Sequence, residues 1–194
     1  MPMEPTRGPA RASRRAALGV LAAPPLAWLA GCSPELDWRE IRAEDAGVLV
    51  MLPAKPARMA RAINLEGLSL EMTMVGAQVR EIAYTVGTVV LPEDSDAMRA
   101  RALASMRAAM VRNIGGTVGA ERAVQVVRVD MGGQRTGVAS AVEIEAGGRM
   151  RDREATLIAR FVAVGTQAWQ AVVLGARPDR EAAALFLESL KLMR

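Results

Sequence analysis

The clearest folding signal in the chain is the stretch GVASAVEIEAGGRMRDREATLIARFVAV, residues 137–164. Its first ten residues alternate between apolar and polar side chains, with Glu143 and Glu145 on the polar side. A period of two predicts a strand that has one covered face. Gly147-Gly148 predicts a tight turn, and residues 155–164 are apolar at successive positions, as in a central strand covered on both faces. The stretch therefore predicts two antiparallel strands within a sheet.

Further strands are predicted on both sides of this hairpin from short apolar or alternating runs between glycines and prolines. They are residues 47–52, 58–65, 68–75, 79–91, 123–129 and 168–174. Two helices are also predicted. Residues 96–114 follow several N-cap candidates and contain no Pro or Gly, and residues 180–192 begin after Pro178-Asp179. Because tight Gly turns favour antiparallel neighbours, we predict an α+β fold: one antiparallel sheet with two main helices packed on it.

The first 31 residues are arranged as a bacterial signal peptide. A basic segment that ends at Arg14-Arg15 precedes 14 apolar residues, 16–29, and then small residues follow. This order is typical of a secretory signal. A membrane-spanning helix, the competing interpretation, needs about 20 apolar residues. Pro24-Pro25 also interrupts the shorter stretch found here, so we favour cleavage over a retained span.

Leu29-Ala30-Gly31-Cys32 resembles the lipobox of bacterial lipoproteins. The resemblance implies that the Cys32 thiol takes a diacylglyceryl group and that a peptidase cuts between Gly31 and Cys32. Two or three acyl chains would then anchor the protein stably, where one chain would bind only marginally. The alternative is an ordinary signal peptide with a chance cysteine. Ser33 stands where an Asp would favour the inner membrane of enteric bacteria, so the outer membrane is favoured.

The export route stays open between two possibilities. Ser13–Leu18 resembles the twin-arginine export signal through Arg14, Arg15 and Leu18, although Ala17 stands where Phe is commoner. A general secretory signal, in which the arginines supply only positive charge, explains the same residues.

The chain after the signal falls into two parts. Residues 32–46 form the lipidated cysteine and a polar tether with a turn or a helix, in which the Trp38 ring packs on the domain. Residues 47–194 form a single α+β domain.

Composition excludes several kinds of chemistry. The chain has no histidine, and its one cysteine is Cys32. Histidine acid–base catalysis, internal disulfides and Cys/His metal sites are therefore absent, and we predict no metal or cofactor. Four of the 25 basic residues and one of the 21 acidic residues precede Cys32, so the mature part is close to neutral. A nucleic-acid partner, which needs a clustered basic face, is not indicated.

The mature part resembles the PsbP-like sandwich family, which includes the photosystem PsbP subunit and the bacterial lipoprotein DcrB. Val50–Pro56 is similar to the opening strand and corner of that family. A strand with Trp169, followed by a helix with Phe186–Lys191, is similar to its closing segment. The resemblance covers about residues 45–192 and implies an accessory role in membrane-associated assemblies, with no shared catalytic residues to transfer.

Glu143 and Glu145 are the one carboxylate pair that could serve acid–base chemistry, because residues i and i+2 of a strand share a face. Arg149, Arg151 and Arg153 follow the glycine pair. A ladder of exposed ion pairs across the predicted turn explains the same pattern, and we favour it.

Other candidate sites have a structural explanation. Ser189 and Lys191 are two residues apart on a predicted helix, so a nucleophile and its base would point in different directions. Arginines on the long helix indicate a solvated face rather than a surface for lipid headgroups or acidic partners, and periodic methionines indicate core packing rather than an adaptable groove. The arginines are Arg99, Arg101, Arg107 and Arg112, and the methionines are Met72, Met74, Met98, Met106 and Met110.

The sequence therefore predicts a non-enzymatic, lipid-anchored protein of the cell envelope. We expect it to face the periplasm and to bind an envelope protein or a small ligand, with no catalytic residues. Two alternatives remain open: an envelope hydrolase that uses Glu143 and Glu145, and a structural subunit of an envelope complex.

Overall fold

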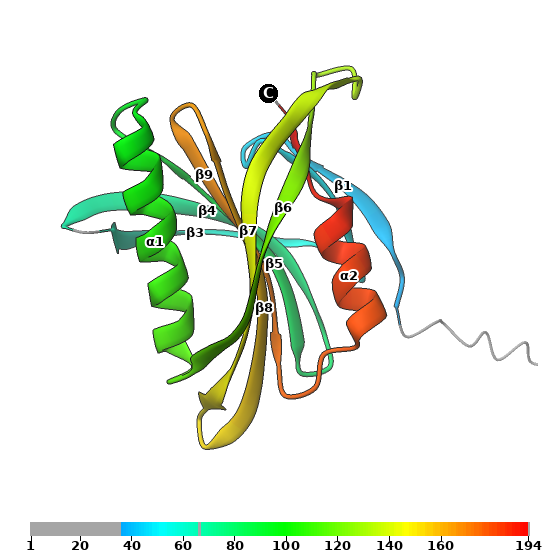
Figure 1. Ribbon diagram of the computed structural model, residues 1–194. Helices are drawn as coiled ribbons and strands as arrows, with labels where there is room; N and C mark the ends of the chain where they lie inside the picture. Colours follow the sequence, from blue (N-terminus) through cyan, green and yellow to red (C-terminus); the bar gives the residue numbers. More distant parts are fainter. Residues whose placement is uncertain (1–35, 66, 194) are drawn as a thin grey trace, which may run out of the picture. The chain divides into compact units, whose positions relative to one another are not determined.

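The structure is a computed structural model that describes residues 36–65 and 67–193. Its helices are α1 (Asp96–Asn113) and α2 (Arg180–Ser189). Its strands are β1 (Arg39–Ala43), β2 (Val48–Leu52), β3 (Ala57–Leu65), β4 (Leu68–Val79), β5 (Ile82–Val90), β6 (Thr117–Val129), β7 (Arg135–Met150), β8 (Arg153–Val164), β9 (Gln167–Gly175) and β10 (Lys191–Met193) (Figure 1).

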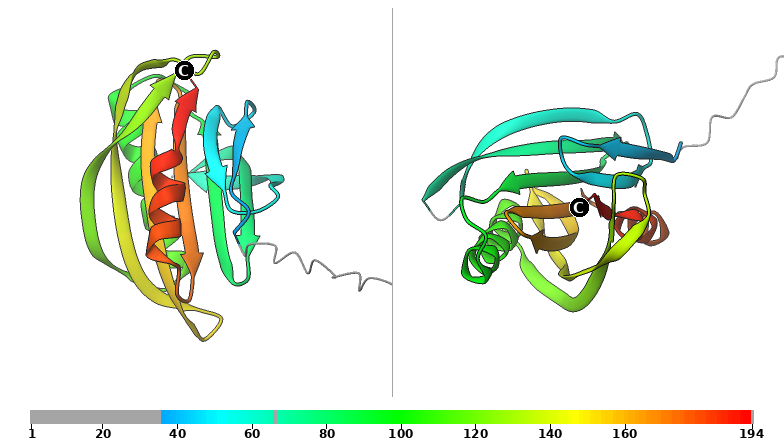
Figure 2. Two further views of the ribbon diagram at one scale, coloured as in Figure 1. Left: turned by 90° about the vertical axis from the view of Figure 1, so that its right-hand side faces the viewer. Right: turned by 90° about the horizontal axis from the view of Figure 1, so that it is seen from above.

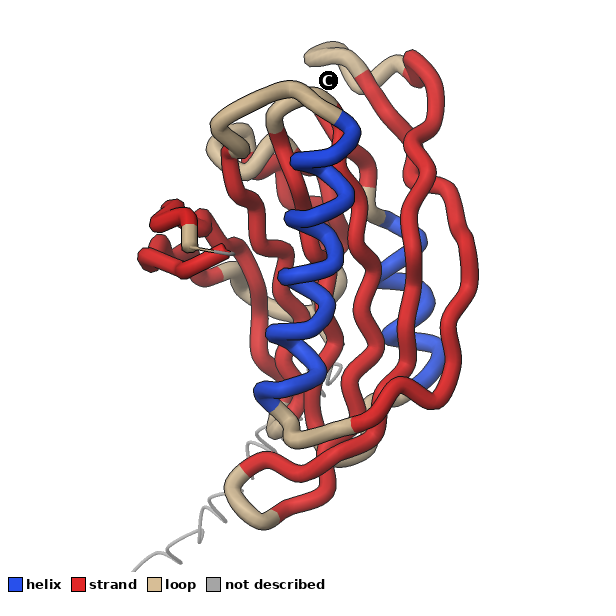
Figure 3. The backbone as a smooth tube through the Cα atoms, turned by 60° about the vertical axis from the view of Figure 1, so that its left-hand side comes forward, coloured by secondary structure: helices blue, strands red, loops and turns tan. Residues whose placement is uncertain are grey.

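All ten strands belong to one curled sheet in the order β1-β2-β10-β6-β7-β8-β9-β5-β4-β3 (Figure 2). Every neighbouring pair is antiparallel except β10 and β6, which run parallel. The two helices are separated by the central strands, as the tube in Figure 3 shows. α1 packs against β8 and β9 from one side, and α2 packs against β2, β8 and β9 from the other.

The prediction of an α+β sandwich is wrong, because the fold is mostly β. The helices have 18 and 10 residues, and the sheet with its ten strands dominates the structure. The curl of the sheet brings buried residues of β2 into the same core as buried residues of β5 and β9. The sheet therefore covers much of its own inner face, which the prediction assigned to helices.

The predicted turn at Gly147-Gly148 is also wrong, because β7 continues through both glycines to Met150. The chain turns instead at Arg151 and Asp152, which both have positive φ. A Cβ at position 148 would lie 2.3 Å from the carbonyl oxygen of Ile114. Glycine is required there because the end of α1 approaches the strand closely, and the N–H of Arg149 donates to that same carbonyl at 2.6 Å.

Two short strands replace predicted non-strand structure. The final helix ends at Ser189 rather than at residue 192, because Leu190 is extended and the next three residues form β10. The polar segment that we expected to be a tether with a turn or a helix contains β1, which pairs with β2. The Trp38 ring packs edge-on against Tyr84, with ring centroids 6.2 Å apart.

Two hydrophobic cores lie on opposite faces of the central strands. The α1 core contains Met72, Met106 and Met110, which confirms the core role predicted for these methionines. The α2 core contains Trp169 and Phe186, which are both fully buried. Neither helix in the described part of the chain has the length and apolar character needed to cross a membrane.

Candidate functional site

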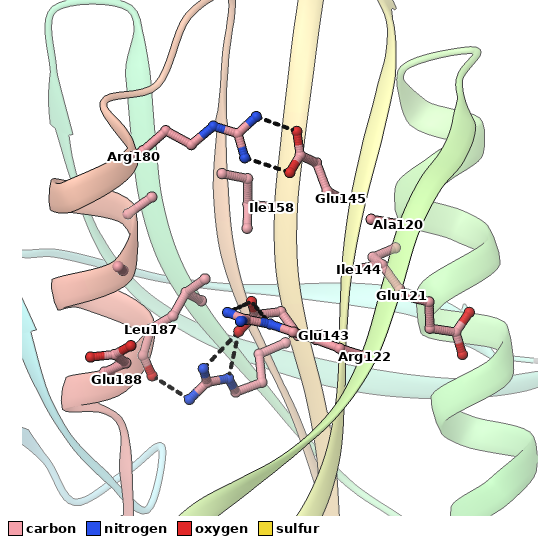
Figure 4. A pocket seen from close by; sticks show the side chains of 13 residues that line it. Ala120, Glu121, Arg122, Glu143, Ile144, Glu145, Ile158, Arg180, Leu187 and Glu188 are labelled. Carbon is pink, nitrogen blue, oxygen red and sulfur yellow. Dashed lines mark hydrogen bonds and ion pairs between the residues drawn. The ribbon is translucent and has the colours of Figure 1, made fainter.

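A cavity of about 320 Å³ lies between α2 and the strands β6, β7 and β8 (Figure 4). Both glutamates singled out from the sequence, Glu143 and Glu145, line it from β7. Their alternation with apolar residues places them together on the α2 side of the sheet, since successive side chains of a strand point to opposite faces. Ile144, the residue between them, is buried in the α1 core on the other face.

Glu143 is buried and is held between two arginines. Its Oε1 accepts hydrogen bonds from Nε and Nη2 of Arg122, at 2.9 and 2.5 Å. Its Oε2 accepts from Nε and Nη2 of Arg160, at 3.0 and 2.6 Å. The three residues lie directly opposite one another on neighbouring strands, because Arg122 of β6 and Arg160 of β8 are both register partners of Glu143. The carboxylate therefore receives a donor at each of its four lone-pair positions.

Arg160 is the buried cation of this cluster, with only 5% of its surface exposed. Besides its two bonds to Glu143, its Nη1 donates to the carbonyl oxygen of Leu187 at 2.8 Å. Leu187 lies in the last turn of α2, which has no basic residue of its own. Because a helix C-terminus carries a partial negative charge, Arg160 supplies from the sheet the cation that α2 lacks.

Glu145 forms a separate pair with Arg180, the first residue of α2. Nη1 and Nη2 of Arg180 donate to the two carboxylate oxygens at 2.5 and 2.6 Å. These hydrogen bonds hold the pKa of Glu145 below its ordinary value, with attraction by the Arg180 charge acting the same way and burial opposing both. The pair connects the N-terminal end of α2 to β7, while the Arg160 cluster connects the C-terminal end to β8.

These contacts are poorly suited to catalysis by the two carboxylates. A carboxylate acid–base pair needs one protonated group and one group with an accessible lone pair. Glu143 has its lone pairs occupied by arginine N–H groups, and Arg180 favours the ionised form of Glu145. The described geometry offers no proton donor from this pair.

The predicted ion-pair partners of the two glutamates are wrong. Arg153 pairs with Glu81, at 2.6 Å, and Arg149 donates to the carbonyl oxygen of Asp152. The ladder across Gly147-Gly148 does not form because those glycines lie inside β7.

Other candidates from the sequence have structural roles. The hydroxyl of Ser189 accepts from the N–H of Met51 at 2.9 Å and donates to the carbonyl oxygen of Phe186 at 2.7 Å, so it joins the end of α2 to β2. Arg99 pairs with Asp94 and Asp96 at the start of α1, and Arg107 pairs with Glu121 of β6. These contacts hold local structure together.

Within residues 36–65 and 67–193, no group of three or more acidic side chains could hold a metal ion. The twin arginines Arg14 and Arg15, the cleavage residue Gly31 and the lipidation residue Cys32 all lie outside the described residues.

No family model and no curated protein sequence matches the chain. Among solved structures, it is similar to a protein from Pseudomonas aeruginosa described as a "Protein of Unknown Function" and a "Putative Regulator". The match has a TM-score of 0.36 and 12% identity, and covers 60% of this chain and 83% of the other. A similarity this low carries no argument about fold or function.

Proposed function

We propose that this chain is a lipid-anchored protein of the bacterial cell envelope whose folded part binds a partner without catalysing a reaction. The observation that carries the anchor is the sequence Leu29-Ala30-Gly31-Cys32 at the end of a basic and then apolar segment. With the acyl chains on Cys32, the folded part would face the periplasm, with the outer membrane favoured by Ser33.

Two features of the described residues support a binding role. The cavity beside α2 is open to a ligand and has both charged and apolar walls. Its two glutamates are engaged by arginines, which leaves neither placed for acid–base chemistry. Partners of the kind expected are another envelope protein or a small ligand.

Mass spectrometry of the protein isolated from native membranes tests the anchor. We expect the N-terminus at Cys32 with a diacylglyceryl group and further acyl mass, and Cys32→Ala should move the protein out of the membrane fraction. Retention of residues 1–31, or an unmodified Cys32 thiol, would refute the anchor.

The absence of catalysis needs its own measurement. Hydrolysis of peptide, ester and glycoside substrates should be no greater for the purified protein than for the variant Glu143→Gln/Glu145→Gln. Robust turnover that this variant loses would support the hydrolase alternative and contradict our proposal.

A further inference from the structure

One edge of β6 lacks a strand partner over most of its length. β7 pairs with β6 on one side from Thr117 to Val129. On the other side, β10 pairs only with Val127, Arg128 and Val129. Along the described chain, no strand or loop forms backbone hydrogen bonds with residues 117–126 on this side. Every second residue of that segment therefore presents its N–H and C=O groups outward.

The unpaired edge borders the cavity. Ala120, Glu121 and Arg122 line the cavity from β6, while Ala183, Ala184, Leu187 and Glu188 line it from α2. The left view of Figure 2 shows why the edge is open, since β10 continues upward from α2 beside the end of β6. In the described chain, only the three residues of β10 lie beside this edge of β6. The residues that precede β10 form α2 and so do not continue the strand along β6.

We infer that an extended peptide segment of a partner protein binds here as an added strand, between the free edge of β6 and α2. Strand addition to an exposed sheet edge is a recurrent form of peptide recognition, in which main-chain hydrogen bonds give affinity and side-chain pockets give specificity. The added strand would prolong the line that β10 begins. This inference rests on the binding role proposed above and specifies the class of ligand.

The cavity walls indicate which side chains the peptide carries. Ala120 of β6 and Ala184 of α2, which are both exposed, offer an apolar surface for one small apolar side chain. The Arg122–Glu143–Arg160 cluster contains two cations and one anion. Arg122 is 67% exposed, and no described residue accepts a hydrogen bond from its Nη1. A carboxylate on the peptide would satisfy this guanidinium in a charge-assisted hydrogen bond.

The position of that carboxylate is restricted to the β6 side of the cavity. Glu188, which forms no ion pair with another described residue, lies on the α2 wall and would repel an acid placed near it. We therefore expect a peptide with one acidic residue directed at Arg122 and small apolar residues at alternate positions.

A single strand fits this edge better than a second copy of the chain. Charged residues and irregular pairing on an edge oppose its association with another whole sheet. β6 carries Glu121 and Arg122 on the open segment and has a register shift between Val118 and Ala120. α2 stands on the far side of the cavity, so an occupant must be narrow.

A library of random heptapeptides, panned against the full lipidated protein in detergent, tests the inference. We expect enriched sequences with one acidic residue and alternating small apolar residues. Ala184→Trp, which fills the cavity from α2, should weaken binding about tenfold or more, and so should Arg122→Ala. Leu185→Trp and Arg101→Ala are matched controls at exposed positions outside the cavity, and they should leave binding unchanged.

Hydrogen exchange of the backbone amides separates strand addition from binding of a side chain alone. Addition of an enriched peptide should slow exchange in residues 117–126 by about tenfold, because outward N–H groups become hydrogen bonded. Failure to enrich any sequence, or unchanged exchange in β6, would overturn the inference. Protection of the same amides without peptide at high protein concentration would also overturn it, in favour of a second copy.

These outcomes are independent of the anchor. A protein that lacks acyl chains but selects such peptides would refute only the lipid anchor. A lipidated protein that selects none would refute only the peptide groove.

Discussion

The two faces of the central strands differ in the side chains that they bury. Under α1, the buried side chains are aliphatic, methionine or, at Phe161, aromatic, and the buried Gln170 contacts the sulfur atoms of Met72 and Met110 at 3.7 Å. Under α2, the same strands bury Glu143 and Arg160 at 6% and 5% exposure. Both faces are therefore stabilised by apolar burial, but the α2 face also keeps one ion pair, Glu143 and Arg160, away from water.

The buried ion pair is not explained by stability alone. Moving a charged pair out of water costs several kcal/mol, which its mutual attraction only partly offsets, so a buried pair is weak evidence of stabilisation. Apolar residues of similar volume would serve α2 packing at least as well. The pair lines the cavity for which a peptide ligand was proposed above, and Arg160 also donates to the carbonyl oxygen of Leu187 at the end of α2.

The largest effect is expected from removing the shared anion. Glu143→Leu leaves Arg160 buried beside Arg122 with no carboxylate, which should lower the free energy of unfolding by about 3–5 kcal/mol. Urea denaturation followed by circular dichroism measures this change.

The double variant Glu143→Leu/Arg160→Met is the control for this prediction. Because it removes both buried charges, it should recover most of the lost stability. If the single variant were as stable as the unchanged protein, the cluster would not be buried as described.

An intermediate effect is expected in the α1 core. Met106 is 2% exposed, so Met106→Ala should lower the free energy of unfolding by about 3 kcal/mol through lost burial and a residual cavity. Thermal unfolding at low and high salt checks the result, and the loss should be the same in both, since no charge is involved. Met106→Leu, which nearly conserves volume, should cost less than about 1.5 kcal/mol.

The smallest effect is expected for the exposed ion pair of Arg180 and Glu145. Arg180→Ala should change the free energy of unfolding only slightly, because Arg180 is 71% exposed and water screens the pair. The pKa of Glu145 is lowered in the folded protein from its ordinary value of 4.5. Its contribution is therefore present above that value and is lost as the pH falls through the folded pKa.

Urea denaturation at a series of acidic pH values measures this difference. The stability curves of Arg180→Ala and the unchanged protein should differ above pH 4.5 and converge below it. A difference that grew as the pH fell would contradict the assigned pair.

The sequence identified the central hairpin but not its turn. Alternation around Glu143 and the apolar run at 155–164 predicted β7 and β8, and the structure confirms both strands and their antiparallel pairing. Gly147-Gly148 led to the wrong turn because Gly148 is needed for a close approach to Ile114, which lies more than thirty residues earlier. Local patterns carry no information about such an approach.

The short strands were missed for a related reason. β10 has only three residues, too few for a periodic signal, and β1 carries three charged side chains among its five residues, so it lacks the apolar run that identified β2. Their conformation depends on pairing with β2 and β6, which a local reading cannot supply.

The sequence identified the two glutamates of the candidate site but not their arginine partners. Alternation singled out Glu143 and Glu145, and the cavity brings them together. Their partners are 17 to 35 residues away in the chain, so no spacing rule could assign them. Of these partners, only Arg160 could have been predicted to be buried and paired. It is a single arginine within an apolar strand, and a buried arginine is almost always paired with an anion.

The three residues of β10 also determine how the molecule would come apart. They join β1 and β2 to the other seven strands of the sheet, because β10 forms two register pairs with β2 and three with β6. Because Lys191 pairs with Leu49, almost all of the described chain separates the two partners, and we expect their pairing to be a late step in folding. On heating, we expect the sheet to open first at β10, between β2 and β6. This partial unfolding should occur at temperatures well below that at which the whole domain unfolds.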